Sequence, residues 1–229
     1  MKDRQLKIKT KKKIRMNAII VGATGATGKD LVNLLFTDSF FEKVDIFVRR
    51  EPPISNSKLN INIIDFNKPE QWKKLVKGDV LFSCLGTTLK AAGSKDAQWK
   101  IDYEYQYEFA KAAKENGVSN YVLVSSDSAS KNSPFFYTKM KGQLEEDIKK
   151  LGFEKTIIFN PPLLDRKNSK RTGEVWGLKI FNFLNSLGIL KSQKPLSTEI
   201  LARAMINALK TLDKGTHHIR QQDALNYDN

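Results

Sequence analysis

The sequence predicts an α/β protein in which a doubly wound parallel sheet is covered by helices on both faces. Two observations predict this fold. Short apolar runs suited to buried parallel strands alternate with helical patterns over most of the chain. A glycine-rich segment also separates the first of these strands from the first helix. Such sustained alternation implies a parallel sheet joined by right-handed crossovers.

The predicted elements follow one another without an internal repeat or a low-complexity linker, so residues 16–229 are interpreted as a single domain. The expected strands are Ala18–Val21, Val44–Val48, Ile61–Ile64, Val80–Cys84, Tyr121–Val124 and Thr156–Phe159, with His217–Arg220 as a short final strand. The expected helices are Lys29–Thr37, Pro69–Val76, Tyr103–Asn116, Phe136–Leu151, Val175–Leu187 and Ile200–Leu212.

Local signals support several of these elements. Leu31 and Leu34 recur at helical spacing in the first helix. Pro69 suits the first turn of a helix, because that turn leaves amide hydrogens unpaired and proline has none. Gly117 and Gly152 are placed to end two helices, since glycine readily adopts the left-handed C-cap conformation.

The net charge of +14 is concentrated at the start of the chain. Residues 1–16 contain eight Lys and Arg residues against one Asp, which is half of the total. The remaining charge is ordinary for a protein that binds a multiply charged phosphate ligand. We therefore expect residues 1–15 to be a basic disordered leader and expect no nucleic-acid partner. A basic electrostatic arm, or an upstream start codon with Met16 as the working initiator, are the alternatives.

Composition sets further limits. Hydrophobic residues make up 40% of the chain, including 13 Phe, which is enough for a sizeable core. No apolar stretch reaches the roughly 18–20 residues that a membrane span needs. The single cysteine, Cys84, excludes an intramolecular disulfide and the usual zinc clusters, and we predict no metal site. Together with the absence of a secretory signal pattern, these features favour a cytoplasmic protein.

The segment Gly22-Ala-Thr-Gly25-Ala-Thr-Gly28 follows the first expected strand and opens the first helix. In this position the first glycine allows a tight turn, the second lets the backbone approach a pyrophosphate, and the third lets helix and strand pack closely. Exposed amides and the helix dipole then attract phosphate. The segment predicts a Rossmann-type dinucleotide-binding turn. The residues expected around the pyrophosphate are Gly22, Thr24, Gly25, Ala26, Thr27 and Gly28.

The end of the second expected strand predicts which dinucleotide binds. An acidic residue there accepts a hydrogen bond from the ribose of NAD, whereas arginine pairs with the 2′-phosphate of NADP. The strand ends at Arg49 and Arg50, and Asp45 lies too early, where its side chain points into the layer. We therefore expect NADP, with NADPH preferred over NADH. Asp65 is a candidate acceptor for the adenine amino group, or an ordinary turn former, and Phe66 is a candidate surface for the adenine ring.

Tyr137-Thr-Lys-Met-Lys141 is a Y-x-x-x-K sequence at the start of an expected helix. A spacing of four residues places both side chains on one helix face. A lysine ammonium near a phenol stabilises the phenolate, and such a tyrosine can exchange a proton with a substrate carbonyl during hydride transfer. Ser126, or Ser125 before it, would hold the same oxygen. These four residues are the predicted catalytic group of an NADPH-dependent oxidoreductase that reduces a small carbonyl or enone.

Taken together, these motifs resemble the atypical short-chain dehydrogenases/reductases, and in particular the branch of Tat-interacting-protein-like NAD(P)H-binding oxidoreductases. The matching segments occur in order over nearly the whole chain after Met16. They are the glycine turn, Arg49-Arg50, Asp65-Phe66, Ser83-Cys-Leu-Gly-Thr-Thr88, Ile101-Asp-Tyr-Glu-Tyr105, Ser125-Ser126, Tyr137 to Gly142, and Gly173-Glu-Val-Trp176. By this resemblance Leu85, Gly86 and Thr87 line the nicotinamide ribose.

The sequence departs from the family pattern after the sixth expected strand. Relatives usually have Arg-Pro-Gly there, and this chain has Asn160-Pro161-Pro162. The resemblance implies that the backbone near this turn meets the nicotinamide carboxamide, so Asn160 and Pro161 are carried over as cofactor contacts. It also implies a small C-terminal region that covers the substrate, in which Trp176 and Phe181 form either an apolar wall or core.

Two functions are consistent with these residues. An intact Ser/Tyr/Lys set favours a reductase. The altered turn at Asn160 and the basic leader favour an NADPH-sensing regulator or assembly factor that binds a protein partner with little or no turnover, since fold does not decide function. The sequence leaves open the identity of the substrate and whether two subunits pair as a homodimer.

Overall fold

A computed structural model describes residues 15–162, 164–165 and 195–228. The predicted leader, except Arg15, lies outside the described residues. The same holds for the expected helix Val175–Leu187 and for the Gly173–Trp176 segment of the region predicted to cover the substrate. The sheet, the glycine turn and the predicted catalytic group all lie within the described part of the chain.

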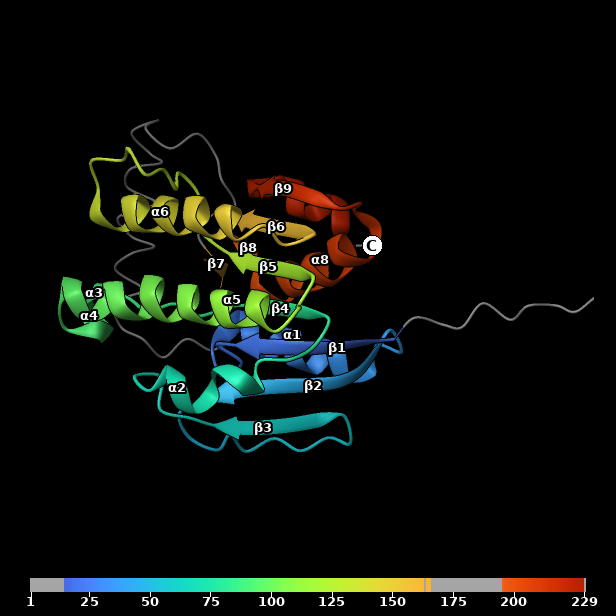
Figure 1. Cartoon of the computed structure of the whole chain (residues 1–229). Helices are drawn as coiled ribbons and strands as arrows, with labels where there is room; N and C mark the ends of the chain where they lie inside the picture. The colour runs from blue at the N-terminus through green and yellow to red at the C-terminus, as the bar shows by residue number, and fades with distance from the viewer. Residues whose placement is uncertain (1–14, 163, 166–194, 229) are drawn as a thin grey trace, which may run out of the picture.

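Seven parallel strands form the central sheet, in the order β3-β2-β1-β4-β5-β6-β9 (Figure 1). Their bounds are β1 (Met16–Val21), β2 (Phe41–Val48), β3 (Leu59–Ile63), β4 (Val80–Ser83), β5 (Asn120–Val124), β6 (Lys155–Asn160) and β9 (Gly215–Arg220). The strand order reverses between β1 and β4, where the chain returns from β3 to the other side of β1. This is the Rossmann strand order with one strand added next to β6, and it confirms the predicted fold.

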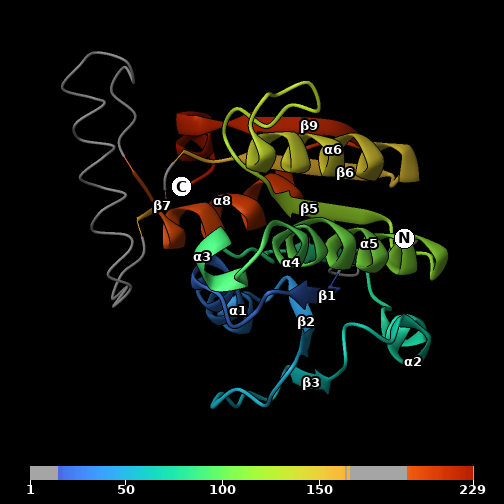
Figure 2. The ribbon, with the colours of Figure 1, turned by 90° about the vertical axis from the view of Figure 1, so that its left-hand side faces the viewer.

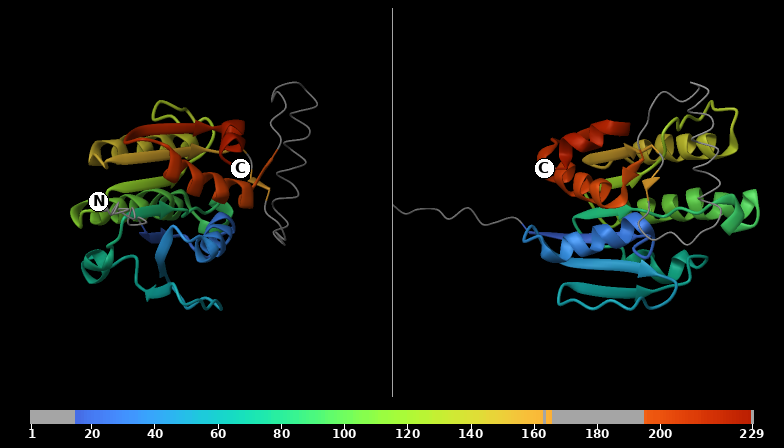
Figure 3. Two further views of the ribbon diagram at one scale, coloured as in Figure 1. Left: turned by 90° about the vertical axis from the view of Figure 1, so that its right-hand side faces the viewer. Right: turned by 180° about the vertical axis from the view of Figure 1, so that it is seen from behind.

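Helices cover both faces of the sheet (Figure 3). One face carries α1 (Ala26–Thr37) and α8 (Thr198–Thr211), and the other carries α2 (Pro69–Trp72), α5 (Tyr105–Glu115) and α6 (Phe136–Leu151). Each face has its own apolar core, the first containing Leu31 and Met205 and the second Phe109 and Leu144. Strands buried on both faces must be apolar throughout, which explains the continuous apolar runs in the sequence.

Two short helices that the sequence pattern did not predict follow β4, and they lie at the carboxyl edge of the sheet (Figure 2). They are α3 (Leu89–Ala92) and α4 (Lys95–Trp99). The hydroxyls of Thr88 and Ser94 cap them by accepting hydrogen bonds from backbone amides at 3.1 and 3.0 Å. A π-helical stretch, Lys100–Glu104, then joins α4 to α5. Such stretches are rare, and those that occur are often found at functional sites. This one contains Asp102.

The other differences from the expected elements concern their ends and the shortest pieces. α1 begins at Ala26 because Gly25 is its N-cap, and α8 begins at Thr198, where the Ser197 hydroxyl caps it. The remaining short elements are the 3-10 helices Lys73–Leu75 and Gln221–Tyr227 and the paired strands β7 (Leu164–Asp165) and β8 (Leu196–Ser197). Two-residue strands have no periodic pattern that a sequence can reveal. No helix among the described residues is both long and apolar enough to cross a membrane.

Candidate functional site

The glycine turn is held by close backbone contacts, with Gly28 of α1 against Gly22 and Gly22 against Cys84 just after β4. Gly22 has a φ of +83°, in the left-handed region that favours glycine. A Cβ on Gly22 would lie 2.4 Å from the carbonyl carbon of Cys84, and one on Gly28 would lie 2.1 Å from the carbonyl oxygen of Gly22. No side chain caps the first amides of α1, because Gly25 occupies the N-cap. This arrangement fits a pyrophosphate, which would accept hydrogen bonds from those amides.

Lysine side chains lie at both ends of α1, and only the one at the C-terminal end complements the helix dipole. At its C-terminal end the Lys58 ammonium donates to the carbonyl oxygens of Asp38 at 2.8 Å and Leu35 at 3.4 Å, which complements the dipole. At its N-terminal end Lys29 adds a cation, and the first turn contains no acidic residue. A cation is unfavourable there, because the helix dipole places positive partial charge at the N-terminus. A bound anion would offset both the Lys29 ammonium and this partial charge.

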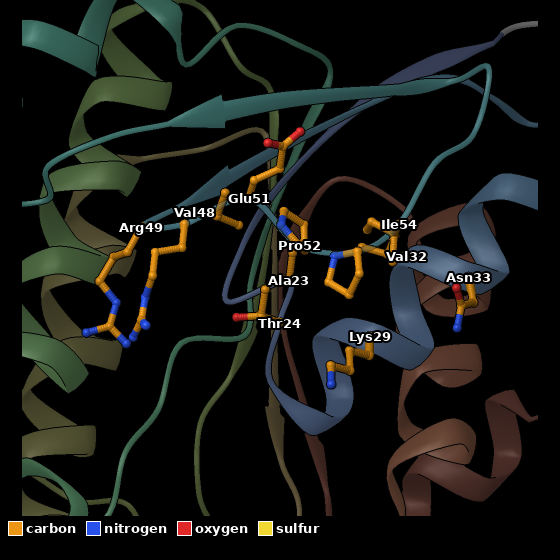
Figure 4. A pocket seen from close by; sticks show the side chains of 12 residues that line it. Ala23, Thr24, Lys29, Val32, Asn33, Val48, Arg49, Glu51, Pro52 and Ile54 are labelled. Atoms are coloured by element: carbon orange, nitrogen blue, oxygen red, sulfur yellow. The ribbon is translucent and has the colours of Figure 1, made fainter.

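A cavity of about 560 Å³ lies between the glycine turn, α1 and the segment after β2 (Figure 4). Its lining residues are Ala23, Thr24, Lys29, Val32, Asn33, Val48, Arg49, Arg50, Glu51, Pro52, Pro53 and Ile54. Figure 4 shows Lys29 and Arg49 on either side of Thr24, with the Glu51 carboxylate directed away from both. Within the described part of the chain, no ion pair forms at Lys29, Arg49 or Arg50. The cavity therefore carries an excess of positive charge suited to a phosphate group.

Asp45 is buried, as the sequence analysis predicted. Its side chain accepts a hydrogen bond from the Asn60 amide at 2.5 Å and lies 3.2 Å from the Lys43 ammonium. The carboxylate is therefore occupied inside the sheet layer. The acidic residue typical of NAD-specific sites is thus missing from the tip of β2, where Arg49 and Arg50 stand instead.

A second cavity, of about 370 Å³, lies beside the first, and Arg49 lines both. Its lining residues are Arg49, Ile64, Asp65, Phe66, Asn67, Ile101 and Tyr105. The Asp65 carboxylate accepts hydrogen bonds from the backbone amide of Asn67 at 2.9 Å and from its side chain at 3.0 Å. These bonds hold the pKa of Asp65 below its usual value. Asp65 therefore builds the turn after β3, the alternative role that its sequence position allowed.

Phe66 contributes its ring to the core. Only 7% of the residue is exposed, and its ring centroid lies 5.2 Å from that of Tyr105 and 5.5 Å from that of Phe109. The ring therefore forms part of the cavity wall and is held by aromatic neighbours on its other side. Its predicted stacking against an adenine is limited to the small part of the residue that stays exposed.

The loop after β4, which contains Leu85, Gly86 and Thr87, is tied to the π-helical stretch. The Thr87 amide donates to Asp102 Oδ1 at 2.7 Å, and its carbonyl accepts a hydrogen bond from Gln98 at 3.3 Å. Asp102 is fully buried, and its Oδ2 has no hydrogen-bond partner among the described residues. Burial raises the pKa of Asp102, and the nearby Lys141 ammonium partly opposes this rise.

Tyr137 and Lys141 lie one turn apart at the start of α6, with different exposure. Tyr137 is 38% exposed, whereas Lys141 is only 2% exposed. The backbone of α6 touches the loop before it, because a Cβ on Gly142 would lie 2.2 Å from the carbonyl carbon of Ser130. This contact fixes the first turns of α6 against the loop that follows β5. The predicted catalytic pair is therefore held on a rigid element with its tyrosine open to solvent.

The two predicted serines have different environments. Ser125 is buried, and its hydroxyl donates to the Glu145 carboxylate. Ser126 is partly exposed, and its hydroxyl donates to the carbonyl oxygen of Asp127 at 3.0 Å. Among the described residues, no hydrogen bond joins either serine to Tyr137. Since the bond from Ser126 is a local one to its neighbour, Ser126 can reorient toward a ligand more readily than Ser125.

Glu145 is a buried carboxylate beside the predicted catalytic group that the sequence did not indicate. It lies on α6 one turn after Lys141, is 6% exposed, and accepts a hydrogen bond from the Asn160 amide at 2.6 Å. Asn160 thus has a specific partner in the position where relatives usually have arginine. Burial raises the pKa of Glu145. The signal that could have found it is the i, i+4 spacing from Lys141, which places both side chains on one face.

Comparisons with known proteins agree with this fold and glycine turn, which define a protein that binds a nicotinamide dinucleotide. Residues 22–211 match the model of a family described as NAD(P)H-binding. Protein FMP52-1, mitochondrial, from Scheffersomyces stipitis is 36% identical over 208 residues, which cover 87% of this chain and 91% of that protein. Protein HTATIP2 from Rattus norvegicus is 31% identical over 234 residues, which cover 98% and 95% of the two chains.

The chain therefore belongs to the NAD(P)H-binding family and is an atypical short-chain dehydrogenase/reductase, which confirms the resemblance found in the sequence. Solved structures show the same fold. UDP-glucose 4-epimerase from Thermotoga maritima is similar with a TM-score of 0.68 at 12% identity, covering 89% of this chain and 76% of that one. The oxidoreductase ylbE from Lactococcus lactis is similar with a TM-score of 0.62 at 16% identity, covering 85% of each chain.

The relatives correct one expectation. FMP52 proteins from several fungi, including Saccharomyces cerevisiae at 40% identity over 164 residues, are named mitochondrial. The prediction of a cytoplasmic protein was therefore wrong. It rested on a single cysteine and a missing secretory signal, and neither feature distinguishes the cytoplasm from the mitochondrion.

Replacing Glu145 by Gln tests the effect of its buried charge on stability. A carboxyl whose pKa is raised on folding contributes stability at low pH that is lost as the pH rises through the folded-state pKa. The amide cannot ionise, so the melting temperature of Glu145→Gln should rise relative to wild type as the pH increases above about 4.3, the usual pKa of a glutamate. Thermal melts followed by circular dichroism across this range measure the difference.

Glu146→Gln is the matched control. The neighbouring Lys149 ammonium lowers the pKa of Glu146, so its charge stabilises the fold and that stability is present above the usual pKa of a glutamate. The control variant should therefore lose melting temperature relative to wild type as the pH rises. A melting-temperature difference that changes in the same direction for both variants would contradict this account.

Proposed function

We propose that the protein is an NADPH-dependent oxidoreductase that reduces a small carbonyl or enone substrate. The observation that carries the cofactor part is the cavity beside the glycine turn, where Lys29, Arg49 and Arg50 stand without ion-pair partners among the described residues. A phosphate monoester on the adenosine ribose is the ligand group that this charge would hold. The neighbouring cavity at Asp65 is the place for the adenine.

Different residues of the chain bind the rest of the cofactor and act on the substrate. The N-terminal amides of α1 bind the pyrophosphate, and the loop from Leu85 to Thr87 lies next to the nicotinamide ribose. When bound, the dihydronicotinamide supplies the hydride. Tyr137 gives a proton to the substrate oxygen, Lys141 stabilises the charge that this leaves on the phenol, and Ser126 holds the oxygen. Ser125 is assigned a supporting place, because its hydroxyl is engaged by Glu145.

Replacing both Arg49 and Arg50 by Ala should change cofactor preference. Losing charge-assisted contacts to the 2′-phosphate should weaken NADPH binding about tenfold or more, while NADH binding changes little. Fluorescence titration of both cofactors measures this. Lys111→Ala, on the exposed surface of α5, is the control for a general loss of positive charge. Wild-type protein that binds NADH as tightly as NADPH would overturn the role of the two arginines.

Tyr137→Phe should lower turnover about a hundredfold or more, since general acid–base catalysis contributes roughly that much. NADPH affinity should stay within about threefold, because the phenol acts on the substrate. The assay follows NADPH oxidation during a screen of aldehydes, quinones and enones. Tyr107→Phe on α5 is the matched control. Turnover that survives in Tyr137→Phe would remove this residue from the mechanism.

The second candidate function is an NADPH-sensing regulator or assembly factor. The specific observation in its favour is that the serine hydroxyls are bonded to Glu145 and to the Asp127 carbonyl, and neither is bonded to Tyr137. Tight NADPH binding with no Tyr137-dependent turnover over the whole screen would support this function and contradict the reductase.

The names of the fungal relatives also support a mitochondrial location for this chain. The full chain, fused to a fluorescent protein at its C-terminus and expressed in budding yeast, should coincide with a mitochondrial marker. Diffuse cytosolic fluorescence of that fusion would contradict the proposal. A second fusion that lacks residues 1–15 tests whether the basic leader directs the location.

A further inference from the structure

A network of four polar side chains, called here the Glu145 network, joins α6 to the ends of neighbouring strands. Its members are Ser125, Glu145, Asn160 and His218. The Glu145 carboxylate accepts hydrogen bonds from the Ser125 hydroxyl and from the Asn160 amide at 2.6 Å. The side-chain oxygen of Asn160 lies 3.4 Å from Nδ1 of His218 on β9. One carboxylate on α6 therefore contacts residues at the carboxyl ends of both β5 and β6.

The network continues into the turns that follow β5 and β6. The amide nitrogen of Asn160 that bonds Glu145 also donates to the carbonyl oxygen of Ser126 at 3.0 Å. The backbone amide of Asp127 in turn donates to the carbonyl oxygen of Pro161 at 3.0 Å. The two turns are thus bonded to each other, and Glu145 connects them both to α6.

This arrangement lowers the stability of the folded protein. Glu145 is 6% exposed, and the closest cationic candidate among the described residues is His218, whose Nδ1 lies 4.0 Å from the second carboxylate oxygen. Burial, together with Lys149 and Arg220, lowers the pKa of His218, so the imidazole stays neutral at physiological pH. A buried carboxylate without a close cation is destabilising compared with an apolar residue of the same size. The position of Glu145 is therefore better explained by the two turns that its hydrogen bonds hold than by a contribution of its side chain to core packing.

The position of the network relates it to one half of the dinucleotide. In the proposed function the adenosine half occupies the two cavities at Arg49 and Asp65, over the ends of β2 and β3. A dinucleotide that crosses the sheet at the reversal between β1 and β4 has its other half over β4, β5 and β6. The turns held by Glu145 lie at that side. We propose that Glu145 is a positioning residue for the nicotinamide half, since its two hydrogen bonds fix the turns on which that half rests.

This inference rests on the proposed binding of NADPH, and the experiment separates the two. The full-length wild type, Glu145→Leu and Glu145→Gln are titrated with NADPH and with adenosine 2′,5′-bisphosphate, which carries the adenosine half and has no nicotinamide. Calorimetry gives both affinities, and the fluorescence of NADPH reports whether the nicotinamide is held. Leucine keeps the size and removes the acceptors, whereas glutamine keeps one oxygen that accepts both hydrogen bonds. Glu146→Leu, at the next position of the same helix, is the control.

Glu145→Leu should bind NADPH about tenfold more weakly and lose the fluorescence enhancement, while its affinity for the bisphosphate stays within about twofold of wild type. Glu145→Gln and Glu146→Leu should keep both affinities. If Glu145→Leu does not fold, Asn160→Ala removes the other side of the bridge and should show the same selective loss. Equal loss of both probes, an unchanged NADPH affinity, or failure of glutamine to substitute would each overturn the inference. Wild-type protein that binds neither probe would overturn the proposed function first.

Discussion

The direct backbone contact between Gly28, Gly22 and the end of β4 is the constraint on which the rest of the site depends. A side chain at Gly28 would collide with the backbone of Gly22 and move the start of α1 away from the sheet, and one at Gly22 would collide with the backbone of Cys84 after β4. The amides of α1 would then no longer point at the edge where the strand order reverses. In the proposed function the pyrophosphate lies at this contact, which would divide the edge into an adenosine side at β2–β3 and a nicotinamide side at β4–β6.

Several charged groups at the carboxyl edge of the sheet are placed unfavourably for the stability of the free protein. Lys29 stands at the end of α1 where the dipole disfavours a cation. Asp102 and Lys141 are almost completely buried, and one oxygen of Asp102 has no hydrogen-bond partner among the described residues. Glu145 adds a second buried carboxylate. Perturbed carboxyl groups that gather at one edge of a sheet are typical of functional sites.

The parts of the candidate site that are continuous in sequence could be proposed from local patterns. The glycine turn, the arginine pair after β2 and the Y-x-x-x-K segment are each read from a few neighbouring residues, and the structure places all of them at the carboxyl edge of the sheet. The sheet was predicted for the same reason, because strands buried on both faces leave unmistakable apolar runs. Asp45 was excluded as a ribose ligand because its position in the strand predicts a side chain that points inward, and the residue is buried.

Features that depend on packing between distant segments could not be predicted in this way. Nothing near Asp102 indicates that it would be buried against Thr87, because this requires the π-helical stretch to form. The partnership of Glu145 with Asn160 joins residues from α6 and β6, and only the fold brings them together. Helices α3 and α4 are too short for a periodic signal. The predicted compartment was wrong because amino-acid composition indicates the redox environment and carries little information about the organelle.

The most direct test of the central claim is the location of the dinucleotide on the protein. Backbone amide resonances recorded during an NADPH titration, or a crystal structure of the complex, would provide it. The account predicts that the pyrophosphate contacts the amides of residues 25–28, with the 2′-phosphate at Arg49 and the nicotinamide over the turns after β5 and β6. A complex in which NADPH leaves the amides of residues 25–28 unaffected, or in which the nicotinamide lies over β2 and β3, would contradict it.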